Sequence, residues 1–139
     1  FAKTPWTPPG TTPVRHPHAL GVLGPTTLLV HGVQVDEEEV GLLAETGTKV
    51  VLCPRSNANL EVGAAPLAPY AKHGVELALG TDSRGSSPDL DVKNEARFLW
   101  GRAEPRLLVR ALTRGGYRAL GLPTPRLTRG TPLSLVHFL

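Results

Sequence analysis

Three short apolar segments, each followed closely by polar residues, constrain the fold of this chain more than any other feature. They are residues 27–31 (TLLVH), 49–53 (KVVLC) and 75–79 (VELAL). Runs of this length and composition are typical of strands buried on both faces of a parallel sheet. Because segments with helical patterns follow them, the sequence predicts an α/β fold in which right-handed crossovers join parallel strands.

Helix signals lie between and after these strands. Residues 36–45 begin with acidic side chains, which favour a helix N-terminus. A helix at residues 104–113 and a final turn at 117–120 flank Gly115 and Gly116, which we expect to interrupt the helical run. The remaining predicted helices are residues 14–23, 66–73 and 91–100, and residues 133–138 (LSLVHF) are a candidate terminal strand.

The composition excludes several classes of protein. The chain has 139 residues, of which 40% are hydrophobic, and a formal net charge of +3. This suits a buried core in one domain or in part of a larger one. No run approaches the roughly 18 apolar residues that a membrane span needs, so we expect no membrane partner. The single cysteine, Cys53, rules out an internal disulfide framework and indicates a reducing, cytoplasmic compartment.

Side chains that can carry chemistry follow each predicted strand. His31 ends the first, Ser56 comes shortly after the second, and Asp82 comes shortly after the third. Ligands of parallel α/β folds bind at the carboxyl ends of the strands, so we expect these three side chains to converge on one cleft. A histidine and an aspartate there suit a divalent metal or a proton-transfer pair. The alternative is a satisfied core histidine and an aspartate that only caps its loop.

The residues around these positions resemble a known family. The stretches HGVQVDEEEVGLLAETGTKVVLCPRSN and LALGTDSRGSSPDLDVKNEARF are similar to the C-terminal part of the metal-dependent amidohydrolases. The nearest branch is the deaminases and chlorohydrolases, which include adenosylhomocysteine, aminofutalosine, cytosine and guanine deaminases. The resemblance covers roughly residues 14–122. It implies a TIM-type (β/α)8 barrel with a small β-domain built from both chain ends, in which the three strands are strands six, seven and eight.

The resemblance also implies how the chain is divided and which residues form the site. Residues 1–26 would be a Pro-rich arm and connecting helix, 27–122 part of the barrel, and 123–139 a segment toward the small β-domain. Asp82 matches an aspartate that binds the catalytic metal and handles a proton of the attacking water. His31 matches a histidine that is a metal ligand in binuclear relatives and contacts substrate or water in mononuclear ones. The substrate-binding positions would be Arg55, Ser56, Asn57 and Ser83.

The implied activity is hydrolysis of a C–N bond, most simply deamination of a purine-like or other heterocyclic amine. The implied cofactor is a divalent metal, zinc or alternatively iron, that lowers the pKa of a bound water toward about 7. The family's other metal-binding histidines do not precede His31, and His16 and His18 match only their spacing. Three strands cannot close a barrel. We therefore expect the chain alone to be inactive and to associate with the remainder of the barrel or with copies of itself.

A second hypothesis starts from arginines that recur every four residues. They are Arg102, Arg106, Arg110, Arg114 and Arg118. Such a stripe could bind the phosphates of a nucleic acid, or a protein partner, and would make the chain a non-catalytic binding module. Only Trp100 and Tyr117 lie near it as stacking platforms, so we do not expect a nucleic-acid partner. The alternative is a solvated outer face, or one paired with acidic groups elsewhere in a longer parent chain.

Three other positions have simple structural interpretations. Cys53 is expected to be a small buried hydrophobe at a strand end rather than a nucleophile. His73, just before Gly74, is expected to cap a helix C-terminus. The glutamates at residues 37–39 are expected to form a solvated helix start.

Overall fold

A parallel sheet of three strands forms the centre of the molecule in the computed structural model, which describes residues 8–124 and residue 129. The strands are β1 (Leu28–Val30), β2 (Lys49–Leu52) and β3 (Leu77–Leu79), in the order β1-β2-β3. Val50 of β2 is the register partner of Leu29 on one side and of Leu77 on the other. The predicted parallel α/β arrangement is therefore confirmed for these strands. The candidate strand at residues 133–138 lies outside the described residues.

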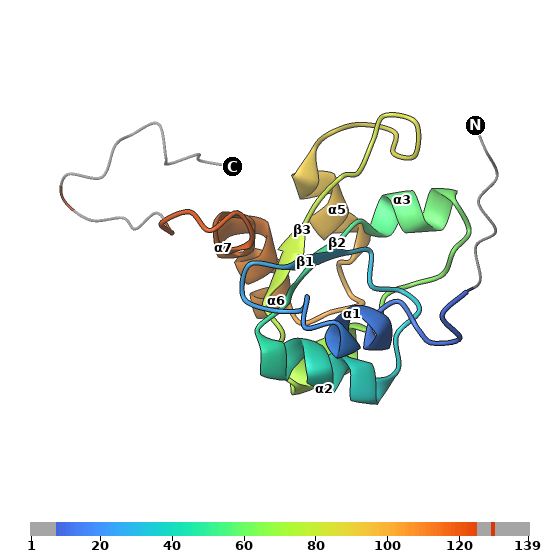
Figure 1. Cartoon of the computed structure of the whole chain (residues 1–139). Coiled ribbons are helices and arrows are strands. Elements are labelled where there is room, and N and C mark those ends of the chain that lie inside the picture. The colour runs from blue at the N-terminus through green and yellow to red at the C-terminus, as the bar shows by residue number, and fades with distance from the viewer. Residues whose placement is uncertain (1–7, 125–128, 130–139) are drawn as a thin grey trace, which may run out of the picture.

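Helices connect the strands and continue after the last one (Figure 1). They are α1 (Arg15–Ala19), α2 (Glu37–Thr46), α3 (Pro54–Asn59), α4 (Leu67–Lys72), α5 (Val92–Phe98), α6 (Pro105–Arg110), the π-helix η1 (Ala111–Gly115) and α7 (Gly116–Ala119). The predicted helix at 14–23 is shorter than expected, because Gly21 adopts a φ of 68° just after it. Helix α3 is not predicted by the sequence pattern. It begins at Pro54, whose fixed φ suits the first helical position.

Helix α2 shows how the sequence sets its boundaries. The Asp36 side chain accepts a hydrogen bond from the Glu39 amide at 2.8 Å, and the Glu39 carboxylate accepts one from the Asp36 amide at 2.9 Å. This capping box satisfies donors that a helix start leaves unpaired. Gly47 ends the helix in the left-handed conformation, with a φ of 68°. The expectation of a solvated start is wrong for Glu39, which is 2% exposed and also accepts a hydrogen bond from Thr12.

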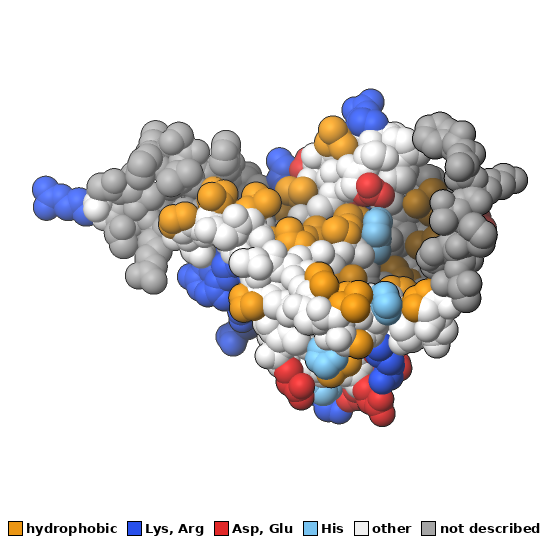
Figure 2. Space-filling model, viewed as in Figure 1, with side chains coloured by type: hydrophobic (Ala, Val, Ile, Leu, Met, Phe, Trp, Pro, Cys, Tyr) orange, Lys and Arg blue, Asp and Glu red, His pale blue; other side chains and the backbone are white. Residues whose placement is uncertain are grey.

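The core lies between the sheet and the helices. It includes Leu43 of α2, Val50 of β2, Tyr70 of α4 and Leu108 of α6, all buried. The expectation that every strand is buried on both faces is wrong for β1. Leu28 is 38% exposed and Val30 47%, because no described element covers that face of the strand. Figure 2 shows apolar side chains gathered on this side of the molecule.

The helical run after β3 is continuous through the two glycines. Helix α6, η1 and α7 follow one another without a break, and both Gly115 and Gly116 have helical backbone angles. The expected interruption is therefore wrong. The reason for a glycine at position 115 is close packing, since a Cβ there would lie 2.1 Å from the carbonyl oxygen of Leu77 in β3. Within the described residues, no helix is long and apolar enough to cross a membrane.

Candidate active site

Three polar side chains from separate strand ends meet at one edge of the sheet. His31 follows β1, Ser56 lies in the first turn of α3 just after β2, and Asp82 lies in the loop after β3. The Ser56 hydroxyl donates to Asp82 Oδ2 at 2.8 Å, and His31 Nε2 lies 4.0 Å from the same oxygen. The structure thus brings together the three residues expected to converge. The parallel sheet accounts for this, because all three strands point their carboxyl ends to the same edge.

Asp82 is held in one orientation by two hydroxyl groups. Besides Ser56, Ser86 donates to Asp82 Oδ2 at 2.9 Å. Hydrogen bonds from Ser56 and Ser86 hold the pKa of Asp82 below its ordinary value, so the carboxylate is ionised at neutral pH. The backbone of Asp82 has a φ of 60°, an uncommon conformation for a residue with a side chain. Such strain persists where the surroundings impose it, and it is concentrated at functional sites.

Ser83 organises the turn that carries Ser86 to Asp82. Its carbonyl oxygen accepts hydrogen bonds from the Ser86 amide at 3.1 Å and from the Ser87 amide at 2.9 Å, and its hydroxyl accepts one from the Gly85 amide. Sequence reasoning placed Ser83 in the substrate pocket and did not identify Ser86. No local spacing pattern distinguishes Ser86, because its contact with Asp82 depends on this turn.

The side chain of Asn57 positions the His31 ring. The ring atom Nδ1 of His31 lies 2.9 Å from Asn57 Oδ1, and the Asn57 side chain is 2% exposed. His31 has a φ of 70°, so the residues after β1 and β3 share the same uncommon backbone conformation. Asn57 thus contacts the histidine, and its expected role in substrate binding stays a prediction.

Arg55 contacts other parts of the chain. Its guanidinium donates to both carboxylate oxygens of Asp89, at 2.9 and 2.8 Å. It also lies 3.6 Å from Glu95, whose side chain is completely buried, while Glu95 accepts a hydrogen bond from the Arg55 amide at 3.0 Å. Arg55 therefore ties the start of α3 to the loop and helix that follow Asp82. Its expected place in the substrate pocket stays a prediction.

Sequence reasoning missed the two acids of this network. The Arg55 hydrogen bonds hold the pKa of Asp89 well below its ordinary value, whereas burial raises the pKa of Glu95. Both acids flank the predicted start of a helix, but their partner is 34 and 40 residues away in the chain. Local charge patterns report pairs within a few residues, so no such pattern identifies this network.

The arginine stripe is partly paired within the chain. Arg110 and Arg118 each donate to Glu76 Oε2 at 2.6 Å. The Arg102 guanidinium lies 4.7 Å from the centroid of the Phe98 ring. The acidic partner, Glu76, lies in this chain, so for Arg110 and Arg118 no acidic group of a longer parent chain is needed. The two ion pairs neutralise part of the positive charge that a phosphate-binding surface would need.

Cys53 is buried, as expected for a small hydrophobe. Burial raises the pKa of its thiol to about 11, and the Asp82 and Glu95 carboxylates add to this effect. The thiolate that a nucleophile needs is therefore scarce at neutral pH. His73 caps the C-terminus of α4 as predicted, and its Nε2 lies 3.3 Å from Glu37.

Comparison with known proteins identifies the family. The model of the amidohydrolase family matches residues 3–138. The chain belongs to the amidohydrolase family. The aminodeoxyfutalosine deaminase of Deinococcus radiodurans is 46% identical over 125 residues, which are 88% of this chain and 30% of that protein. The 5-methylthioadenosine/S-adenosylhomocysteine deaminase of Halobacterium salinarum is 38% identical over 141 residues, covering 93% of this chain and 33% of that protein.

A solved adenosine deaminase structure shares the fold. An adenosine deaminase from Xanthomonas campestris with bound zinc matches with a TM-score of 0.74 and 35% sequence identity, over 81% of this chain and 28% of that one. This chain therefore spans about a third of the length of the curated relatives that it matches. Family membership and this similarity imply a TIM-barrel-like fold, of which the described residues supply a small parallel sheet.

The donor atoms of this amidohydrolase chain fit part of a zinc site. A catalytic zinc takes three protein ligands and keeps one position for water. His31 Nε2 and Asp82 Oδ2 are 4.0 Å apart, whereas two tetrahedral zinc ligands at about 2.1 Å lie about 3.4 Å apart, so a small side-chain movement brings both within reach of one ion. In residues 8–124 and 129, no group of three or more His, Cys, Asp or Glu residues could hold a metal. Within the described residues, His31 and Asp82 are two donor groups, one fewer than a catalytic zinc takes from a protein.

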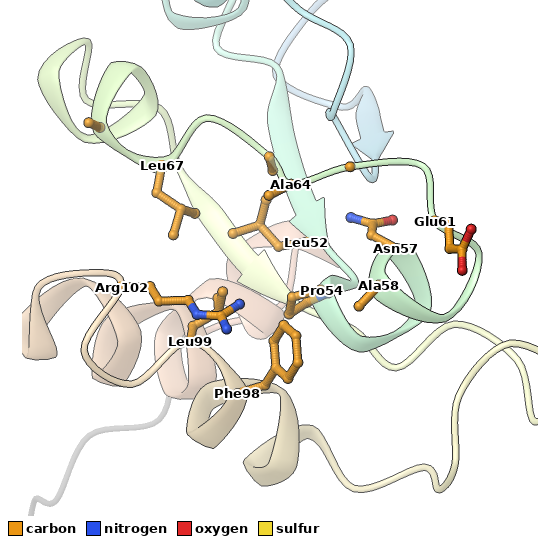
Figure 3. Close-up of a pocket in the computed structure, with 13 residues that line it drawn as sticks. Leu52, Pro54, Asn57, Ala58, Glu61, Ala64, Leu67, Phe98, Leu99 and Arg102 are labelled. Carbon is orange, nitrogen blue, oxygen red and sulfur yellow. The ribbon is translucent and has the colours of Figure 1, made fainter.

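A cavity of about 630 Å³ adjoins the site at Asn57, which is one of its lining residues. Figure 3 shows Leu52, Phe98 and Leu99 on its walls with the Arg102 side chain among them. This volume lies in the range of small-molecule pockets. Neither His31 nor Asp82 lines it. The cavity is therefore separate from the predicted cleft, and Asn57 belongs to both.

Proposed function

We propose that this chain is the C-terminal barrel portion of a metal-dependent hydrolase that deaminates a purine-like or related heterocyclic amine. In such a reaction water adds to the ring carbon that carries the amino group, the C–N bond breaks, and ammonia leaves. The observation that carries the proposal is the Asp82 carboxylate, which two serine hydroxyls hold beside His31 at the carboxyl edge of a parallel sheet. The deaminase relatives support the reaction class.

The residues of this chain would divide the chemistry between them. His31 and Asp82 would help to hold a divalent metal, zinc or alternatively iron, which when bound supplies a Lewis acid that makes water acidic near neutral pH. Asp82 would accept the proton that the attacking water loses, since its lowered pKa keeps it ionised. Ser56 and Ser86 hold Asp82 Oδ2 and so fix the direction of Oδ1.

The proposal also assigns roles to His31 and to the residues on the substrate side of the site. His31 would orient the attacking water or polarise the attacked carbon. Protonation of the ring nitrogen would fall to an acidic group outside this chain. Arg55, Asn57 and Ser83 would contribute to the substrate side of the site, Arg55 and Ser83 through the loops that they hold.

The proposal includes a place in the barrel. Strands β1, β2 and β3 would be strands six, seven and eight, residues 27–122 the barrel portion, 1–26 an arm and connecting helix, and 123–139 a segment toward a small β-domain. The exposed Leu28 and Val30 of β1 support this, since further strands of a barrel would cover them. The partner of this chain would be the rest of the barrel or a second copy, and its location the cytoplasm.

The test is a comparison of variants in the full-length protein. Asp82→Ala should lose both bound metal and turnover, because one carboxylate serves both. His31→Ala should lose turnover heavily and keep much of the metal if the site holds one ion. Arg106→Ala, on α6 away from the site, is the control and should change neither. Metal analysis and an ammonia-release assay over a purine and pterin panel measure these outcomes, and full turnover in Asp82→Ala would contradict the proposal.

A further inference from the structure

The contact between His31 and Asn57 determines which ring nitrogen carries the proton. The atom that faces His31 Nδ1 at 2.9 Å is the carbonyl oxygen of the Asn57 amide, which only accepts hydrogen bonds. A neutral histidine in this contact must therefore carry its proton on Nδ1. The other ring nitrogen, Nε2, then keeps an unshared electron pair.

We propose that Asn57 is a positioning residue that holds His31 in this tautomer, with the Nε2 lone pair directed to Asp82. His31 Nε2 and Asp82 Oδ2 face each other at 4.0 Å. With the proton on Nδ1, both facing atoms are electron-rich, so the space between them favours a cation or a proton donor such as water. With the proton on Nε2, the histidine would instead donate toward the carboxylate and compete with such a ligand. The value of this tautomer to catalysis rests on the proposed function, but the tautomer itself does not.

Asn57 is itself fixed by the backbone around it. The backbone N–H of Asn57 donates to the backbone carbonyl of Cys53 at 2.9 Å. The backbone carbonyl of Asn57 accepts a hydrogen bond from the backbone N–H of Val62 at 3.1 Å. Helix α3, which carries it, begins at Pro54 directly after β2. The side chain is nearly inaccessible to solvent, so water does not compete strongly for its oxygen. Asn57 can therefore act as a rigid acceptor.

The histidine is anchored from its own side as well. The His31 amide donates to the carbonyl of Val51 at 2.9 Å, which continues the pairing of β1 with β2. The next residue, Gly32, accepts a hydrogen bond from the buried Tyr70 hydroxyl at 2.7 Å. With both backbones held, rotation of the ring is the main freedom that remains, and the bond to Asn57 removes it. This is the arrangement by which an outer hydrogen bond sets the tautomer and direction of a ligand histidine.

The test is ¹⁵N NMR of the full-length protein labelled at histidine. Spectra are recorded after zinc removal by chelation, so that the metal does not select the tautomer, and about two pH units above the ordinary histidine pKa of about 6.5. The spectrum of His31→Gln identifies the His31 signals. We expect the wild-type signals of a protonated Nδ1 and an unprotonated Nε2. A protonated Nε2 in the wild-type protein would overturn the inference by itself.

Three variants separate the role of the acceptor from a general structural effect. Asn57→Ala should shift His31 toward the Nε2-protonated form, whereas Asn57→Asp keeps an acceptor oxygen and should preserve the wild-type tautomer. Asn59→Ala, an exposed position in the same helix, should change nothing. An unchanged tautomer in folded Asn57→Ala overturns the inference. If that variant does not fold, the wild-type and Asn57→Asp spectra decide, since either one with a protonated Nε2 contradicts it.

Zinc affinity and turnover distinguish failure of this inference from failure of the proposed function. Where His31 is a metal ligand, loss of its outer hydrogen bond costs about 10- to 100-fold in metal affinity, and Asn57→Ala should show a loss in that range. Where His31→Ala keeps its metal, Asn57→Ala should keep it too and should lose turnover. Asn59→Ala should change neither. A wild-type protein with the expected tautomer but without metal or turnover refutes the proposed function alone. A protein that binds zinc and deaminates, but whose His31 tautomer does not respond to Asn57, refutes this inference alone.

Discussion

Replacement of Gly115 by alanine should destabilise the protein, because the added Cβ atom would collide with the backbone of β3. Gly115 lies in η1 where the helix meets β3, and a Cβ at this position would lie 2.1 Å from the carbonyl oxygen of Leu77 and 3.1 Å from the Cα of Ala78. Both obstructing atoms belong to the backbone of the central sheet. They cannot rotate aside as a side chain can, so the helix or the strand has to move.

The neighbouring glycine gives a matched control. Gly116 has helical angles too, and a Cβ there would meet nothing within 4 Å. Alanine in a helix is more favourable than glycine by about 1 kcal/mol, so Gly116→Ala should gain up to that amount. Overpacking costs about 1–3 kcal/mol, and contact with rigid backbone belongs at the upper end. We therefore expect Gly115→Ala to lose about 2 kcal/mol net, so that the two variants differ by about 3 kcal/mol.

Urea unfolding of the full-length protein, followed by far-ultraviolet circular dichroism, measures this difference. The comparison is of midpoints between variants whose slopes with urea agree, because equal slopes show that the same surface unfolds. If Gly115→Ala is as stable as Gly116→Ala, the close packing of η1 on β3 is not what requires a glycine.

Two further substitutions and one labelling experiment test separate contacts. Arg55→Ala leaves the buried Glu95 carboxylate without its guanidinium partner and should lower the midpoint of urea unfolding; an unchanged midpoint would refute that pairing. Burial raises the pKa of Glu76, but hydrogen bonds from two arginines outweigh it, so the net pKa is lowered. Its stabilisation is complete above about pH 4.3 and is lost as pH falls through the lowered pKa, so the melting temperature of Glu76→Gln should fall less between about pH 5 and 3 than that of the wild type. The Cys53 thiol, with a pKa of about 11, should react with a disulfide reagent only after unfolding, and rapid reaction of native protein at neutral pH would contradict its burial.

Local patterns in the sequence account for the strands, for α2 and for the edge where the site lies. A short apolar run followed by a polar residue indicates a buried strand, and a parallel sheet then places His31, Ser56 and Asp82 at one edge without further information. The capping box of α2 lies within four residues, and its signature is the spacing of Asp36 and Glu39 in the sequence. These features depend on neighbours in the chain.

Contacts between distant segments could not be predicted in this way. From its residue type alone, Arg55 is expected on the surface. Its contact with the buried Glu95 depends on the fold, which brings the two residues together. The sequence pattern predicts that Gly115 breaks a helix. In the structure, its missing side chain lets the helix pack closely against the backbone of β3, which lies about forty residues earlier in the chain. The register of η1 against that strand is a tertiary property, and tertiary packing overrides local propensity.

The most direct measurement of the central claim is the anomalous difference density of a crystal of the full-length protein at the zinc absorption edge. The proposed function predicts a zinc peak at about 2.0–2.2 Å from a carboxylate oxygen of Asp82, with His31 Nε2 either bound to the ion or in hydrogen-bond contact with its water. A zinc-replete crystal in which the only strong peak lies away from Asp82 would contradict the account.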